Sequence, residues 1–173
     1  CVLAVAIYRS SAPIFVVFVV LEVAIALGRI AAWRWNQRRE AAGLPIDVSW
    51  SSLPSLLWCT LQGSVAFVIM SGGDPVLQVL SATLVMAALG QICARNYPAP
   101  SFAMLLLLMM DLPFVVGAVL AEEPLLSVIV ILTPPFIFGA RQIITTFHET
   151  LVASLVAAKQ NLHLAFHDSL TGI

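Results

Sequence analysis

Charged side chains are scarce in this 173-residue sequence, where Asp, Glu, Lys and Arg make up 10% of the residues and hydrophobic residues 61%. A soluble domain carries about 25% charged residues, so this composition and a mean hydropathy of +1.02 exclude a soluble fold. Only eight residues are Lys or Arg, which leaves no basic footprint for nucleic acid. The sequence therefore predicts a membrane protein whose first partner is the lipid bilayer.

Cysteine and histidine are too few and too scattered for a disulfide framework or a metal centre. The three cysteines have no paired spacing, and two of them fall inside apolar runs, which predicts buried free thiols. All three histidines come after the last apolar run. In the segment HETLV, Val152 stands where a zinc H-E-x-x-H helix needs its second histidine, and no kinase pattern comes after His148. We expect no metal and no cofactor in this chain.

Apolar stretches dominate the chain and approach the roughly 20 residues that a helix needs to cross a bilayer. They run over 12–32, 53–71, 75–94, 101–120 and 124–140. The segment 1–7 resembles the second half of a further helix, which suggests that the chain is a fragment at both ends. Backbone groups in lipid are satisfied only within a helix or a closed barrel, and proline is well tolerated in a first turn. Prolines at or near predicted first turns are Pro13, Pro54, Pro75 and Pro124. We therefore predict an all-α polytopic bundle of about six transmembrane helices, the first one truncated.

Charge placement predicts the orientation, because Lys and Arg are retained on the cytoplasmic side of short loops. If the loop 33–52 is cytoplasmic, the residues on that side are Arg34, Arg38, Arg39, Arg95, Arg141 and Lys159. The residues outside are then Asp74, Glu122, Glu123 and, against the trend, Arg9. Aromatic residues at predicted boundaries are Tyr8, Trp33, Trp35, Trp50 and Tyr97, whereas Trp58 falls inside a span. Both termini are predicted to be cytoplasmic.

Three ionisable residues fall inside the predicted spans, where each costs about 2.5–3.5 kcal/mol on insertion scales. Glu22 and Asp111 stand at the centres of their runs, so we expect them at similar depth, sharing a proton or binding a cation or a cationic ligand. Arg29 is two helical turns after Glu22 and close to the boundary. The alternative is that Arg29 neutralises one of the carboxylates and that the site is a structural charge pair. Ala24 and Gly28 form a small-xxx-small pair that favours close helix packing.

Thr133-Pro134-Pro135 interrupts the last span just before the chain becomes more polar. Each proline removes a backbone donor and favours a kink. We interpret Pro134 and Pro135 as a hinge between the bundle and the more polar segment after it, with a static bend as the alternative.

After Arg141 the chain changes from continuously apolar to a helical pattern of apolar and polar residues. The apolar stripe consists of Ile144, Phe147, Leu151, Leu155, Ala158, Leu162 and Phe166. Its 3-4-4 spacing repeats every eleven residues and suits a weakly supercoiled helix pair, so we predict a homodimer through residues 144–166. A helix lying on the membrane surface is the alternative, although such helices are usually more basic than this one.

The chain ends in HDSLTGI, in which Asp168, Leu170, Thr171 and Gly172 match the D-x-L-T-G segment that opens GGDEF domains. The segment resembles that family by its order of residues and by its position after a cytoplasmic helix, with Ile173 in place of the more usual leucine. The resemblance implies a diguanylate cyclase of the bacterial cytoplasmic (inner) membrane, in which a subsequent GGDEF domain makes cyclic di-GMP from GTP with Mg. The catalytic residues of that family are not in this chain.

These observations predict three parts: a transmembrane sensory domain over 1–141, a cytoplasmic signalling helix over 142–166, and the first residues of a GGDEF domain over 167–173. The expected function is that of a sensor and transducer, which perceives a small or lipophilic ligand in the bundle and regulates cyclic di-GMP synthesis. The alternative is a small transporter or channel whose path is lined by Glu22 and Asp111.

Overall fold

The structure is a computed structural model that describes residues 2–45 and 48–166, with side chains for 2–45 and 52–162. The described residues form helices and no strands. In chain order these are α1 Val2–Ser10, α2 Pro13–Ala41, α3 Val48–Met70, α4 Pro75–Asn96, α5 Pro100–Val119, the 3-10 helix η1 Pro124–Ser127, and α6 Val128–Phe166. The predicted GGDEF opening, Asp168 to Gly172, lies outside the described residues.

Five of the described segments are long and apolar enough to cross a membrane, which confirms the predicted all-α polytopic fold. They are Pro13–Ala41, Ser52–Met70, Pro75–Asn96, Pro100–Val119 and Pro124–Leu162. The chain is thus a multi-pass membrane protein. The remaining helix, α1, has nine residues, or about 13 Å at 1.5 Å per residue, which is less than half of a span.

Proline opens three of these helices as predicted. Pro13, Pro75 and Pro124 stand at the first helical positions of α2, α4 and η1. The prediction that Pro54 marks a helix start is wrong, because α3 begins at Val48 and Pro54 lies inside it.

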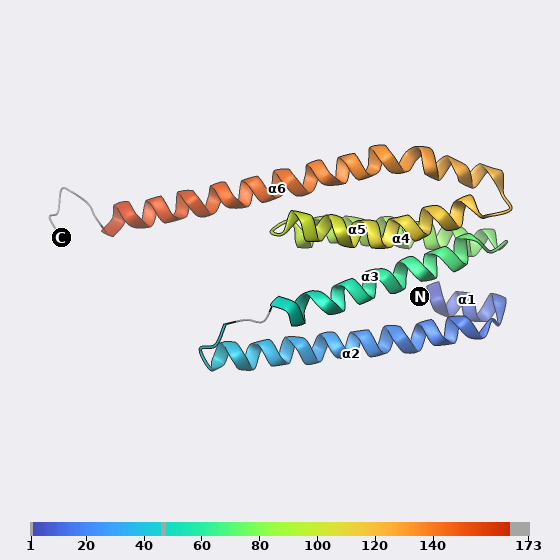
Figure 1. The fold of residues 1–173 in the computed structure, drawn as a ribbon, viewed down its shortest axis with the longest axis horizontal. Helices are drawn as coiled ribbons and strands as arrows, with labels where there is room; N and C mark the ends of the chain where they lie inside the picture. The colour runs from blue at the N-terminus through green and yellow to red at the C-terminus, as the bar shows by residue number, and fades with distance from the viewer. Residues whose placement is uncertain (1, 46–47, 167–173) are drawn as a thin grey trace.

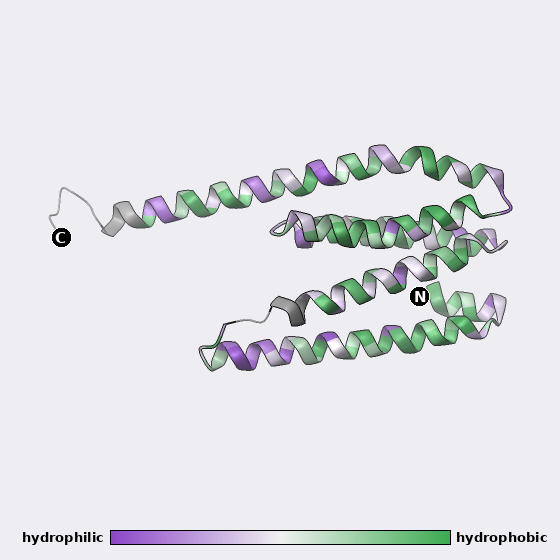
Figure 2. Ribbon diagram, in the orientation of Figure 1, coloured by the Kyte–Doolittle hydropathy of each residue, from purple (hydrophilic) through white to green (hydrophobic). Residues whose placement is uncertain are grey.

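The helices run up and down, with α3, α4 and α5 at the centre and α2 and α6 on the flanks (Figure 1). Helix α3 contacts α2, α4 and α5, whereas α6 contacts only α4, α5 and η1. Both α2 and α6 are mostly apolar within the bundle (Figure 2), and they expose large apolar side chains such as Val20, Leu27 and Ile131, as expected for a surface that lipid covers. Beyond the central helices, α2 and α6 both extend at the same end of the bundle (Figure 1).

Most arginines lie at one end of the bundle, and Asp74, Glu122 and Glu123 lie at the other. The carboxyl end of α2 and the turn between α4 and α5 lie at one end with the extension of α6, and the turns around residues 11, 72 and 121 lie at the other (Figure 1). Arg9, the exception to the predicted orientation, forms an ion pair with Asp74 at the second end. This guanidinium, helped by the amides of Val76 and Leu77 that Asp74 caps, holds the pKa of the Asp74 carboxyl below its usual value.

The closest helix contact joins α3 to α5, which run in the same direction (Figure 1). A Cβ atom added to Gly63 would lie 2.6 Å from the backbone oxygen of Met109, and one added to Gly117 would lie 2.7 Å from that of Phe67. The two glycines therefore let each backbone reach the other at two levels. The pair predicted for close packing, Ala24 and Gly28, has open space at Gly28 instead.

We predict that Gly117→Ala destabilises the protein by about 1–3 kcal/mol, the usual range for overpacking, because its Cβ would strike the Phe67 carbonyl. Thermal unfolding in detergent micelles, followed by circular dichroism, measures the effect. Gly139→Ala is the matched control, since a Cβ there meets nothing within 4 Å. An equal melting temperature for the two variants would contradict the predicted contact.

Candidate functional site

Asp111 is a buried carboxylic acid near the middle of an apolar helix. It lies about 16 Å along α5 from Pro100, at 1.5 Å per residue, and its side chain is 2% exposed. Its Oδ2 atom has no hydrogen-bond partner among the described residues. An unsatisfied buried polar group costs about 1–3 kcal/mol, so this position is unfavourable for stability alone and marks a candidate functional site.

The α3–α5 contact determines which way Asp111 faces. Pro113 and Gly117 lie against α3, and two residues correspond to about 200° around a helix. Asp111 therefore faces away from α3, into a cavity that α4 and α6 complete. The residues lining this cavity are Ala82, Met86, Asp111, Phe114, Ile129, Leu132, Thr133 and Phe136. We call it the Asp111 cavity.

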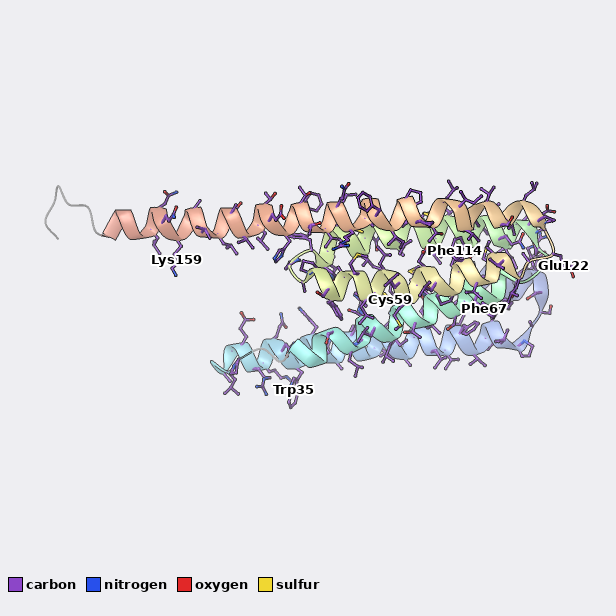
Figure 3. The ribbon with its side chains drawn as sticks, turned by 45° about the horizontal axis from the view of Figure 1, so that its top comes forward. Trp35, Cys59, Phe67, Phe114, Glu122 and Lys159 are labelled. Atoms are coloured by element: carbon purple, nitrogen blue, oxygen red, sulfur yellow. The ribbon has the colours of Figure 1, made fainter. Side chains whose placement is uncertain are left out.

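The Asp111 cavity has a volume of about 350 Å³ and walls that are apolar except at two residues. Of these, Thr133 already donates its hydroxyl to the Ile129 carbonyl at 2.9 Å. The carboxyl of Asp111 is thus the one unsatisfied polar group among its described lining residues. Figure 3 labels Phe114, which lies one turn beyond Asp111, where α6 runs alongside the central helices. Such a site suits a mainly apolar ligand with a single polar or cationic group.

A second apolar cavity continues along the groove between α4 and α6 toward the end of the bundle that carries Arg38, Arg39 and Arg95, which we call the arginine-rich end. It shares Met86 and Phe136 with the Asp111 cavity and has a volume of about 360 Å³. Gly90 and Gly139 also line it, and a Cβ on either would meet nothing within 4 Å. The α4–α6 interface is therefore loosely filled over two neighbouring cavities.

Helix α6 passes through the predicted hinge without interruption. Pro134 and Pro135 both lie inside it, although each lacks the N–H that a helix interior uses. In Figure 1 the amino-terminal part of α6 is inclined to the rest of the helix. Pro135 lines the second cavity, so the predicted hinge is next to the ligand-sized space rather than remote from it.

The structure does not bring Glu22 and Asp111 together. The Glu22 carboxylate accepts a hydrogen bond of 3.1 Å from the Gln62 amide, which lies on α3. The two acids stand at similar depth, since Gly63, next to Gln62, abuts Met110. However, the described backbones of α2 and α5 do not approach each other, and α3 lies between the two acids. Of the glutamines in the spans, Gln62 is the one that satisfies an intramembrane acid.

Arg29 pairs with neither acid, since the ion pair within the described residues joins Arg9 to Asp74. It lines a separate polar pocket near the arginine-rich end, together with Trp58 and Arg95. The predicted site of Glu22, Arg29 and Asp111 thus divides into three separate environments.

The stripe predicted to form a dimer is divided between two surroundings. Its first residue, Ile144, is fully buried in the chain's own bundle, and Phe147 packs edge-to-face on Tyr97 with ring centroids 5.8 Å apart. From Leu155 onward the described stripe residues are exposed, and Leu155 and Leu162 are about 60% exposed. The surface left without a partner therefore begins after Leu151.

We predict that Asp111→Leu increases the free energy of unfolding in detergent by about 1–3 kcal/mol, because it removes an unpaired buried polar group. The melting temperature should rise accordingly. The adjoining cavity leaves room for the larger side chain. Asp111→Asn, which keeps a polar group of the same size, is the control and should give a smaller gain. A strong loss of stability in Asp111→Leu would show that the carboxyl is required structurally.

Within the described residues, no group of three or more His, Cys, Asp or Glu side chains is placed to hold a metal ion. The cysteines Cys59 and Cys93 are buried and free. No protein-family model, curated protein or solved structure matches the chain. Its function is therefore inferred from the Asp111 cavity and from α6.

Proposed function

We propose that this chain is the membrane sensor and transducer region of a diguanylate cyclase. The observation that carries the proposal is the double role of α6, which lines the Asp111 cavity with four residues and continues without a break to Phe166. One continuous helix thus leads from a ligand-sized space toward the D-x-L-T-G segment. A long cytoplasmic helix of this kind has little use in a transporter.

The sensed ligand is a small or lipophilic molecule that enters from the membrane. The apolar walls of the Asp111 cavity favour such a molecule, and the free carboxyl oxygen selects for a hydrogen-bond donor or a cationic group. Binding at this site would relieve the cost of the buried acid, which is the differential interaction that a two-state sensor requires.

Transmission depends on the loose packing of α6. Because Ile129, Leu132 and Phe136 form one wall of the cavity, a bound ligand changes where α6 rests against α4 and α5. The prolines let the helix pivot at this level. The exposed part of the stripe, from Leu155 to Leu162, then pairs with a second copy and sets the spacing of the GGDEF domains, where GTP and Mg bind.

The proposed location is the bacterial cytoplasmic membrane, with the arginine-rich end and the carboxyl end of α6 in the cytoplasm. The placement of basic residues at the end where α6 emerges supports this orientation. A transporter would need Glu22 and Asp111 on one path, but α3 separates them, so the sensor is the better supported function.

Changes at the Asp111 cavity should alter cyclic di-GMP in cells that express the full-length protein. We expect Asp111→Asn, and Ala82→Phe, which fills the cavity, each to shift the level about fivefold or more, the lower end of allosteric coupling. Glu22→Gln should also shift it, because it removes the negative charge from the group that accepts the Gln62 hydrogen bond. Mass spectrometry of cell extracts measures the nucleotide, with membrane abundance as the check on insertion.

The matched control is Ala24→Phe, which adds the same bulk to a lipid-facing position of α2. Nucleotide levels equal to those of the parent in all three site variants would reduce the carboxylates to structural roles. No rise in cyclic di-GMP above an empty vector, for any of these proteins, would overturn the cyclase proposal itself.

The dimer can be tested with two neighbouring alanines, both exposed in the single chain. Ala158 belongs to the apolar stripe, and Ala157 lies about 100° away from it around the helix. In membranes treated with a mild oxidant, the full-length Ala158→Cys protein should form a disulfide dimer, while Ala157→Cys should not. Equal cross-linking of both variants, or of neither, would count against pairing through this stripe.

A further inference from the structure

A small polar pocket lies between α2, α3, α4 and α5, on the side of the bundle away from α6. Its polar lining comes from Arg29, Ser55, Trp58, Gln91, Arg95 and Asn96, and its volume is about 120 Å³. Cys59, labelled in Figure 3, lines it where α3 faces α5. None of these residues belongs to the Asp111 cavity.

The pocket carries two positive charges and no acid. Neither Arg29 nor Arg95 forms an ion pair with any described residue, and no carboxylate is among the lining residues. The nearest acid before Arg29 on α2 is Glu22, which accepts its hydrogen bond from Gln62. Asp111 on α5 faces the opposite side, toward α4 and α6. The two guanidinium groups therefore lack an anion.

The pocket reaches the headgroup level at one end, because Arg95 and Asn96 stand in the last turn of α4. Leu106, which also lines it, is about 9 Å along α5 from Pro100, at 1.5 Å per residue, and α2 continues past Arg29 to Ala41. From this depth the long Arg29 side chain can extend toward the headgroups, and an aromatic ring with a polar edge is favoured near the interface. The place of Trp58 inside a span, unexplained by the sequence, agrees with a polar site there.

We propose that this pocket binds the phosphate group of an anionic phospholipid. The planar guanidinium groups of Arg29 and Arg95 can each donate two parallel hydrogen bonds to phosphate oxygens. Trp58 and Gln91 carry additional N–H donors. The volume admits a phosphate and its immediate substituents but no acyl chain, so the lipid tails would remain outside, in the bilayer. Basic pockets between transmembrane helices are a recurrent form of such recognition. This site does not depend on the proposed cyclase function.

The test compares melting temperatures of the purified full-length protein in nanodiscs of phosphatidylcholine alone or of an equal mixture with phosphatidylglycerol. We expect phosphatidylglycerol to raise the melting temperature of the parent, and Arg29→Gln and Arg95→Gln each to lose at least half of that rise. Arg38→Gln is the control, since it removes the same charge from an exposed position at the same end. Its rise should equal that of the parent.

Two further arms separate the sources and the kinds of contact. Inorganic phosphate, added to the protein in phosphatidylcholine, tests a free anion, and an Arg29-dependent rise with phosphate alone would assign the pocket to soluble phosphate and overturn the lipid assignment. Arg29→Lys keeps the positive charge but loses the planar guanidinium group. A rise in its melting temperature that is smaller than that of the parent therefore supports phosphate recognition. An equal rise with phosphatidylglycerol in all variants, or none in the parent, would overturn the site.

Discussion

The close approach of α3 and α5 is the contact on which the rest of the bundle depends. Lipid provides no hydrophobic driving force between helices, so association rests on close packing and on interhelical hydrogen bonds. Gly63 and Gly117 permit that packing at two levels, and this fixes the rotation of α5. With Gly117 held against α3, Asp111 must face α4 and α6. The Asp111 cavity, its unsatisfied carboxyl and the contact of α6 with both therefore depend on these two glycines.

The sequence was sufficient for the spans because hydropathy and length constrain a membrane helix strongly. The predicted runs agree with α2 to α6 to within a few residues at most ends, and Pro13 and Pro75 open their helices as expected. Pro54 misled, because a proline inside a helix can resemble a first turn when the preceding residues are polar. The depth of Glu22 and Asp111 was also readable, since position along a span gives depth directly.

The sequence does not show which face of each helix points to the core, because the spans are apolar on nearly every side and contain no apolar stripe. Sequence therefore placed Glu22, Arg29 and Asp111 at their depths but not on opposite sides of α3. The glycines that decide this, Gly63 and Gly117, differ from Gly28 only in what faces them. The stripe of α6 shows the same limit, since nothing in its spacing separates Ile144, buried in its own chain, from exposed Leu162.

The length of α6 beyond its prolines gives small motions a large reach. From Pro135 to Leu162 the helix extends for about 40 Å at 1.5 Å per residue, so a tilt of about one-tenth of a radian displaces its far end by about 4 Å. Such a displacement is close to the distance between packed side chains, about 4 Å. If α6 pivots at its prolines as proposed, a small change of tilt at the cavity therefore becomes a change of side-chain packing between two copies at its far end.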